Sequence, residues 1–471
     1  MLSAIVIFPA LVAFYLALTR SVPWAFVHAY IPILLWFPSY FQWHIPGIPD
    51  PNFAEAAIVP LTMLLLIRGP IRWQVSFTDI LVLGFVILTC ISEYRAFGYK
   101  LAQNLMATML LSVWLPYALA KICIEPTGLR VNFGKVVAVV LFIISAIMVF
   151  DMLIGPKYTL WQRVLGRFFN SGWTRDIEVR WGLTRAEGPF AHSIYACIIL
   201  IMGYRIQRWL EWHQAWPLKL KGFPSIAKLS PARIISLGLL AGIFSTLSRG
   251  PWLSGILAAA VLLGLAMIVK LFKRPLQRYL IMGIILLGVV AGGLAVDKAF
   301  KQFAAVGMEE ASESSQERQT VAYRFELFTT YGEIIVEKWA LGWGRLGWPQ
   351  EKIQWSIDNA YLLLALNHGL IVVGCFIALL FYLMIRLFIR SMSQPVTDSP
   401  SKILALTLLA ILIVEGFSLA TVSLQATNQT LLFIIFGWSD AYLTVSRQDT
   451  PVVATINQDN SSLPFRFQRV I

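Results

Sequence analysis

Long apolar stretches with almost no charge recur along the chain, and they limit its fold more than any other feature. Each runs for about 17 to 25 residues, enough to cross a hydrocarbon core of ~30 Å as a helix. Soluble domains have about one-quarter charged residues, whereas this chain has 58% apolar and 13% charged residues. The alternation of a closed barrel is absent, so only helices can satisfy the backbone in lipid. We therefore predict an all-α polytopic membrane protein.

The stretches predict twelve or thirteen transmembrane helices, because the first two could form a single hairpin. Lysines and arginines gather in alternate loops, from Arg68 and Arg72 to Arg386 and Arg390. The positive-inside rule places these loops in the cytoplasm, so the net charge of +13 reflects topology and anionic lipid and predicts no nucleic-acid partner. The expected spans are 2–19, 22–42, 52–67, 77–92, 101–120, 133–154, 188–209, 233–248, 251–271, 279–296, 358–385, 403–423 and 428–445.

Two of the predicted outward segments, 155–187 and 298–355, are long enough to hold chemistry. In the second, Phe325, Phe328, Ile335 and Trp339 recur at helical spacing and predict a helix on the membrane surface. The chain then divides into N-terminal helices (1–154), a core with both outward segments (155–390), C-terminal helices (391–445) and a polar cytoplasmic tail (446–471).

Several cations on the predicted outward side are exceptions to the positive-inside rule. Arg249 lies in a very short turn between two spans, and six more precede the seventh span: Lys157, Arg163, Arg167, Arg175, Arg180 and Arg185. Guanidinium groups bind phosphate in pairs of hydrogen bonds and keep their charge in a partly dry site, which suits a diphosphate-linked lipid. The alternative is that they are solvated loop charges or extend from the helices to the membrane interface.

Three segments occur in order along the core: Arg185-Ala-Glu-Gly188-Pro-Phe190, Ser248-Arg249-Gly250-Pro251-Trp252, and a loop from Arg324 through Gly342-Trp-Gly344 to Asp358-Asn359-Ala-Tyr361. Together they resemble the O-antigen ligase and O-antigen polymerase superfamily over roughly residues 185–375. The resemblance implies a glycosyltransferase of the GT-C type in the bacterial inner membrane, with its active site facing the periplasm. It further implies an undecaprenyl-diphosphate-linked oligosaccharide donor, a glycan acceptor, other polysaccharide export components as partners, and neither cofactor nor metal.

In that family arginines are thought to hold the donor diphosphate, and they correspond to Arg185, Arg249 and Arg324. The ligases have a His-Asn pair followed by a glycine, where this chain has Asp358-Asn359 followed by Gly369. Because the ligase histidine is the proposed base, the change to aspartate favours a polymerase of capsule or exopolysaccharide. A ligase that transfers the glycan to lipid A core or another acceptor stays open.

Glycosyl transfer needs stabilisation of the leaving diphosphate and removal of a proton from the acceptor. Asp358 is the expected base, although it could instead cap the helix that follows. His368 is expected ~15 Å deeper on the same helix and is assigned to packing. His192, Asn359 and Tyr361 are expected to support the site. The buried acid Glu415 is expected to pair with an outward arginine, and Glu55 and Glu93 could do likewise.

A transporter or flippase of lipid-linked glycans is the alternative from another class. Such proteins usually build their site at mid-membrane between repeated halves, whereas here the unusual charges gather at one face. A structural membrane partner is a third hypothesis, which the arginines and Asp358 disfavour.

Overall fold

The computed structural model is almost entirely helical in the part of the chain that it describes, as the apolar stretches predict. This part comprises residues 2–44, 47, 49–68, 73–169, 176–217, 230–272, 274, 276–278, 280–281, 327, 330–349, 357–393, 403–424 and 426–444. The helices are α1 (Ile7–Thr19), α2 (Val22–Ala25), α3 (Ile31–Trp36), α4 (Phe53–Arg68), α5 (Phe77–Phe97), α6 (Tyr99–Thr108), α7 (Leu115–Cys123), α8 (Arg130–Ile154), α9 (Leu160–Leu165), α10 (Ser193–Trp212), α11 (Pro231–Ser245), α12 (Arg249–Leu271), α15 (Ala360–Ser393), α16 (Leu404–Ser418) and α17 (Ala426–Thr444).

Short segments of other geometry join these helices. The 3₁₀ turns are η1 (Leu2–Val6) and η4 (Gly166–Phe168), and the π-helical turns are η2 (Phe26–Tyr30) and η3 (Met109–Trp114). The strands β1 (Val179–Arg180) and β2 (Leu183–Thr184) form one small antiparallel hairpin.

Among the described residues, six helices are long and apolar enough to cross a membrane, so the chain is a multi-pass membrane protein. Three shorter apolar helices accompany them: Val22–Trp36, Pro231–Ser245 and Leu404–Ser418. The count of twelve or thirteen crossings stays a prediction. The six are Leu2–Thr19, Phe77–Phe97, Tyr99–Cys123, Arg130–Ile154, Arg249–Leu271 and Ala360–Ser393.

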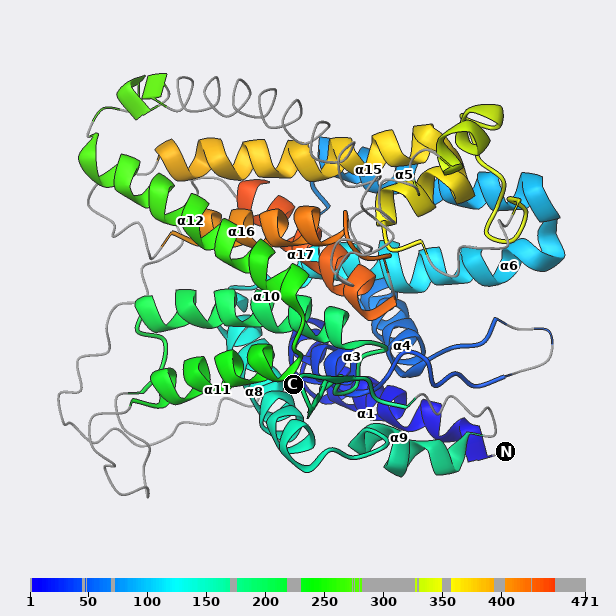
Figure 1. Cartoon of the computed structure of the whole chain (residues 1–471), viewed down its shortest axis with the longest axis horizontal. Helices are drawn as coiled ribbons and strands as arrows, with labels where there is room; N and C mark the ends of the chain where they lie inside the picture. The colour runs from blue at the N-terminus through cyan, green and yellow to red at the C-terminus, as the bar shows by residue number, and fades with distance from the viewer. Residues whose placement is uncertain are drawn as a thin grey trace, which may run out of the picture.

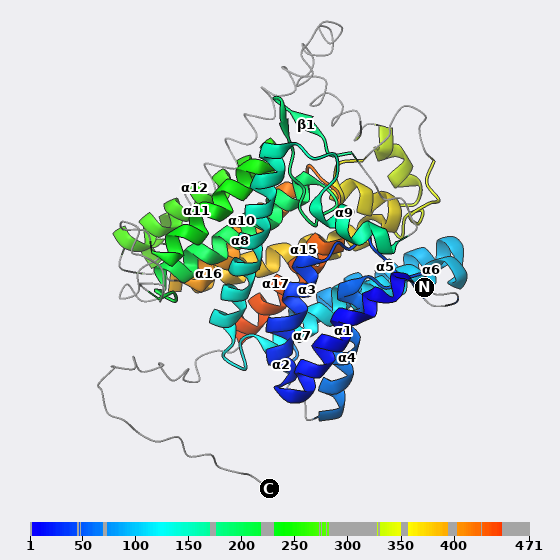
Figure 2. The ribbon, with the colours of Figure 1, turned by 90° about the horizontal axis from the view of Figure 1, so that it is seen from below.

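Helices α15–α17 pack between the N-terminal helices and the group formed by α10 and α12 (Figures 1 and 2). Helix α17 contacts α7, and α16 lies against both α10 and α12. Small residues allow such close approach of backbones in a membrane. At Gly437, for example, a Cβ atom would lie 2.3 Å from the carbonyl oxygen of Tyr117 on α7. The C-terminal helices are therefore the centre of the bundle.

Helix α15 is broken at Gly369, whose φ of 84° divides it into a short arm and a long arm. The Trp339 carbonyl oxygen accepts the Leu370 N–H at 2.6 Å at this break, and a Cβ at Gly369 would collide with Ala340. The long arm then runs antiparallel to α5, because Phe376 contacts Phe85 while the later Tyr382 contacts the earlier Phe77. The segment around residue 340 thus occupies the break.

The break overturns the expected position of His368. Its Nδ1 lies 3.2 Å from the hydroxyl of Ser92, near the end of α5. Tyr361 on the short arm contacts Phe376 on the long arm, with ring centroids 6.3 Å apart. Phe376 lies roughly 10 Å along the long arm from Gly369. Asp358 therefore lies deeper than His368, the reverse of the order that a straight helix predicts. We call this end of the bundle the outer end, after the side that the charge pattern predicts.

The turn between α16 and α17, residues 419–424, is recessed from the outer end. Helix α16 has 15 residues, about 22 Å, and is shorter than a hydrocarbon core of ~30 Å. Its last residue, Ser418, bonds at 3.1 Å to Ser254, which lies in the second turn of α12. The chain thus reverses direction beside the first two turns of α12.

The expected surface helix is present in part, with residues 330–337 helical. Its buried stripe is Leu327, Tyr331 and Ile335, which pack on the short arm of α15. Of the apolar residues that suggested the helix, Ile335 joins this stripe, whereas Trp339 is 56% exposed. The helix therefore packs on the protein itself. Phe325, Phe328, Arg175, Arg324, most of span 279–296 and the tail 446–471 lie outside the described residues.

Candidate functional site

The strands β1 and β2 of the outward segment 155–187 form a hairpin with a two-residue turn, and this hairpin contributes to the site. The turn residues Trp181 and Gly182 have φ of 54° and 75°, the pattern of a type I′ turn that matches the twist of the paired strands. Positive φ is uncommon for a bulky residue and is often found where function constrains the backbone. The hairpin places Arg180 and Arg185 on its two arms.

Arg185 is anchored between the hairpin and the turn that joins α11 to α12. Its guanidinium donates to Ser248 Oγ at 3.1 Å and to the Thr246 carbonyl at 3.4 Å, and it forms an ion pair with Glu178. The residue is only 4% exposed. Because the side chain is fixed by three partners, it holds the outward segment against the start of α12.

Arg180 and Arg249 complete a cluster of three guanidinium groups with Arg185. Arg180 donates to the Leu247 carbonyl at 2.7 Å, and Arg249 lies over the Trp181 ring, 4.9 Å from its centroid. Partial burial lowers the pKa of Arg180, and the positive charges of Arg185 and Arg249 lower it further. The Glu178 carboxylate raises the pKa of Arg180 in the opposite direction, so a carboxylate lies within the cluster of arginines.

His192 caps the start of α10 beside this cluster. Its Nδ1 accepts the Ile194 N–H at 3.1 Å, and its Nε2 lies 3.6 Å from a Glu178 oxygen. The imidazole therefore touches the same carboxylate as Arg185. Its contacts suit a residue that positions the hairpin.

The recessed turn 419–424 binds the start of α15. Asn359 donates to the Ala420 carbonyl at 3.1 Å while its own oxygen accepts the Leu362 N–H at 3.0 Å. Tyr361 donates to the Gly416 carbonyl at 2.9 Å. Asn359 thus caps the helix, and its neighbour Asp358 is exposed. That Asn359 and Tyr361 support the site stays a prediction.

The same turn also meets α10 and α12. Ser423 bonds to the Tyr195 hydroxyl at 2.7 Å, and Tyr195 lies within electrostatic reach of the Asp358 carboxylate. Thr421 lies beside Gly250, where a Cβ would be 3.6 Å from its Oγ1. Arg249 and Asp358 therefore adjoin one turn from two directions. Residues from four separate parts of the chain converge there.

The intramembrane acid Glu415 does not pair with an arginine in the described part of the chain. It is fully buried in α16, and one of its oxygens accepts from Asn428 Nδ2 at 3.2 Å. The expected arginine pairing is wrong because α17 packs beside Glu415 and brings an amide instead. Glu93 does pair with an outward arginine, Arg345, at 2.9 Å. Glu55 accepts from Ser112.

Other predicted cations lie apart from the cluster. Lys157 is paired with Asp176 at 3.8 Å, and Arg163 with Asp151 at 3.7 Å. Sequence reasoning did not distinguish Arg180 from these neighbours, and it missed Glu178. The Trp181-Gly182 pair was the available signal, because a two-residue turn there pairs Arg180 with Leu183 and places Glu178 opposite Arg185. No group of three or more metal-ligating side chains occurs among the described residues.

This arrangement defines a multi-pass α-helical membrane protein with a cationic site at one end. Residues 234–377 match the family model described as O-antigen ligase. The match confirms the resemblance to the O-antigen ligase and polymerase superfamily and supports a ligase- or polymerase-type function in polysaccharide synthesis. It includes Arg249 and Asp358, whereas Arg185 and His192 precede it. No curated protein sequence matches the chain.

Proposed function

We propose that the protein is a periplasmic-side glycosyltransferase of the bacterial inner membrane that polymerises undecaprenyl-diphosphate-linked glycan repeat units for a cell-surface polysaccharide. The observation that supports this most is that the turn 419–424 contacts Gly250 and Asn359, the neighbours of Arg249 in the arginine cluster and of Asp358. A cluster of guanidinium groups suits a diphosphate, and a carboxylate suits removal of a proton. The O-antigen ligase match supports the reaction class.

In the proposed reaction the acceptor hydroxyl attacks the anomeric carbon of the donor sugar. The bond from this carbon to the diphosphate oxygen breaks, and the electron pair leaves with undecaprenyl diphosphate. Arg249, with Arg180 and Arg185 behind it, stabilises the negative charge that develops there. Asp358 accepts the proton of the acceptor hydroxyl. The donor arginines would include Arg324 in the full chain.

The recess of the turn supports this assignment. A lipid diphosphate lies at the membrane interface, and the turn after the short helix α16 lies beside the first two turns of α12. Charged groups interact more strongly where water is partly excluded. Asp358 can therefore lie close to a headgroup that remains in the membrane. A flippase site would instead be expected at mid-membrane between repeated halves.

The test is release of undecaprenyl diphosphate from a lipid-linked oligosaccharide by the purified protein. Arg249→Ala and Asp358→Asn are each expected to reduce turnover about 100-fold or more, the usual effect of removing one group that stabilises the transition state. Arg167→Ala and Asp176→Asn are matched controls, since both residues are exposed in the same outward segment. Unchanged release in both site variants would overturn the assignment.

The products separate polymerase from ligase. A polymerase adds repeat units to a second lipid-linked glycan and yields a ladder, whereas a ligase makes a single transfer to lipid A core or another acceptor. Movement of intact lipid-linked glycan without release of undecaprenyl diphosphate would indicate a transporter.

A further inference from the structure

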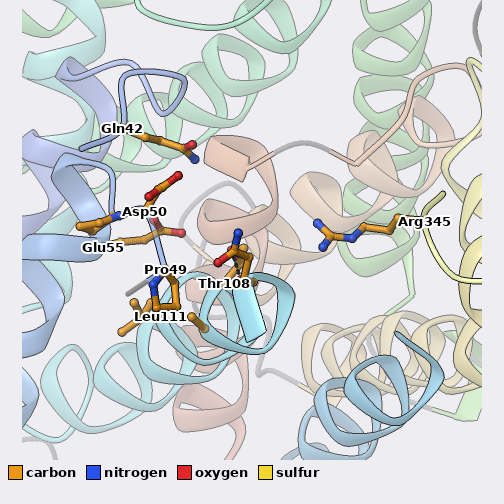
Figure 3. A pocket seen from close by; sticks show the side chains of 10 residues that line it. Gln42, Pro49, Asp50, Glu55, Thr108, Leu111 and Arg345 are labelled. Carbon is orange, nitrogen blue, oxygen red and sulfur yellow. Dashed lines mark hydrogen bonds between the residues drawn. The ribbon is translucent and has the colours of Figure 1, made fainter. Parts of the chain in front are cut away.

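A second polar cavity lies at the outer end, apart from the arginine cluster. It encloses about 230 Å³ between α4, α6 and the loop before α4 (Figure 3). At ~30 Å³ per water, this is room for roughly eight waters, or about one sugar ring. The side chains that matter for its chemistry are Gln42, Asp50, Glu55, Asn104, Thr108 and Arg345.

We propose that this cavity binds a sugar residue of the acceptor glycan. The inference rests on the proposed function, because it assigns a binding site to the acceptor of that reaction. This site is separate from the arginines that are proposed to bind the donor. The cavity would hold a neutral, hydroxyl-rich ring by hydrogen bonds with amide, hydroxyl and guanidinium groups.

The walls of the cavity are well anchored. Gln42 pairs with Asn52 as an isolated β-bridge, which closes the loop at the start of α4. Asn52 then caps α4 by accepting the Glu55 N–H at 3.0 Å. Arg345, which reaches toward the cavity from the opposite side in Figure 3, is held by Glu93 through both its backbone N–H and its Nε. A preformed wall lowers the ordering cost of binding.

The chemistry of the lining favours sugar over anion or metal. Gln42, Asn104 and Thr108 offer donors and acceptors together, as hydroxyl groups require. Two carboxylates, Asp50 and Glu55, disfavour a phosphate. Both oxygens of Glu55 already accept hydrogen bonds, from Ser112 at 2.8 Å and from the Asn52 N–H at 3.0 Å.

Asp50 is likewise engaged, since His44 lies 2.9 Å from it. A hard cation needs several oxygen ligands that are free to coordinate, and these two acids are occupied. A neutral polar ligand is therefore the best fit to the lining.

The cavity is connected to the site of transfer on two sides. Ser112, which bonds to Glu55, lies in η3, and η3 packs against α17, which follows the recessed turn. Glu93, which holds Arg345, neighbours Ser92, whose hydroxyl contacts His368 at the end of the short arm of α15. An acceptor chain held in the cavity would thus lie at the same end of the bundle as the start of α15, which Asp358 precedes.

The experiment measures binding of methyl glycosides of glucose, galactose, mannose, rhamnose and N-acetylglucosamine to the full chain. The protein is placed in lipid nanodiscs without glycoside detergents, and affinity is measured by saturation-transfer NMR titration. At least one glycoside is expected to bind. Asn104→Leu should weaken it about tenfold, the usual effect of losing a hydrogen bond in a closed site. Gln103→Leu is the matched control, because it removes the neighbouring amide of α6 outside the lining.

Turnover gives a second readout. With a lipid-linked donor, Asn104→Leu should raise the KM for acceptor and leave the KM for donor unchanged. The inference is overturned if none of the five glycosides binds, if Asn104→Leu binds them as wild type does, or if Ca²⁺ binds and is lost in Asn104→Leu. Arg249→Ala separates the two proposals. If this variant still binds glycosides, the cavity is supported. If its turnover is unchanged, only the proposed donor site is overturned.

Discussion

Two charged clusters at opposite ends of the bundle differ in how their charges are balanced. At the end opposite the outer end, the Lys121 ammonium lies 2.7 Å from both Asp79 and Asp440, and all three side chains are nearly buried. Tyr117 and Ser76 donate further hydrogen bonds to these carboxylates. At the outer end three arginines lie close together, and of these Arg185 forms an ion pair with Glu178.

The difference separates charges that hold the fold from charges that can hold a ligand. A buried ion pair is stable only when its partners and hydrogen bonds are complete, as they are around Lys121. Arginines that lower one another's pKa, by contrast, are stabilised when an anion binds between them. The comparison therefore assigns the Lys121 cluster to stability and the arginine cluster to binding, with Arg185 sharing both roles.

The largest expected effect is on stability, from Lys121→Met. It leaves two carboxylates close together in a buried site, and losing one partner of a buried pair typically costs about 3–5 kcal/mol. Thermal unfolding in nanodiscs measures this loss. Lys100→Met, at an exposed lysine on α6, should change stability by less than about 0.5 kcal/mol.

A triple variant sharpens this prediction. Replacing Asp79 and Asp440 by Asn together with Lys121→Met removes every charge of the cluster, and should recover much of the stability because neutral replacements of buried ion pairs are often tolerated. Loss of activity with full stability in Lys121→Met would contradict the purely structural role.

An intermediate effect is expected from Arg185→Lys. Lysine keeps the charge but cannot reproduce the bonds to Ser248, Thr246 and Glu178. Breaking hydrogen bonds of a charged group costs about 1.5–3 kcal/mol, so both the unfolding midpoint and turnover should fall. Arg249→Lys is the comparison variant, since the exposed Arg249 should show a change in turnover alone.

The smallest expected effect is that of salt on the two clusters. Screening lengths fall from ~10 Å at 0.1 M to ~3 Å at 1 M, so the KM for the lipid diphosphate donor should rise severalfold over this range. The unfolding midpoint of the protein, to which the Lys121 cluster contributes, should hardly change with salt, because the ions of this cluster are nearly buried. Equal salt dependence of both quantities would remove the distinction between the clusters.

The helical spans were predictable because each one is encoded locally. The expected spans 133–154 and 251–271 correspond to α8 and α12, and even the shorter α16 and α17 begin near their predicted first residues. Transfer of an apolar stretch into lipid depends on its own composition and length. The cationic motif at Arg249 was visible for the same reason, as a charge where the local pattern predicts none.

Partners that lie far apart in sequence were not predictable in this way. The break at Gly369 lies inside an unbroken apolar stretch, and its φ of 84° is stabilised by contacts with residues near 340. A straight helix therefore misplaced His368. The expected partner of Glu415 was wrong because a neighbouring helix supplied Asn428.

Local composition was therefore enough to predict a helical membrane protein, the positions of its six long apolar helices and the cations that depart from the charge pattern. Packing between distant segments, by contrast, brings Arg180 to Arg185 and Arg249, places Asn359 on the turn 419–424, and forms the polar cavity between α4 and α6. The physical reason is that partition into lipid depends on each segment alone, whereas pairing depends on how helices distant in sequence pack together.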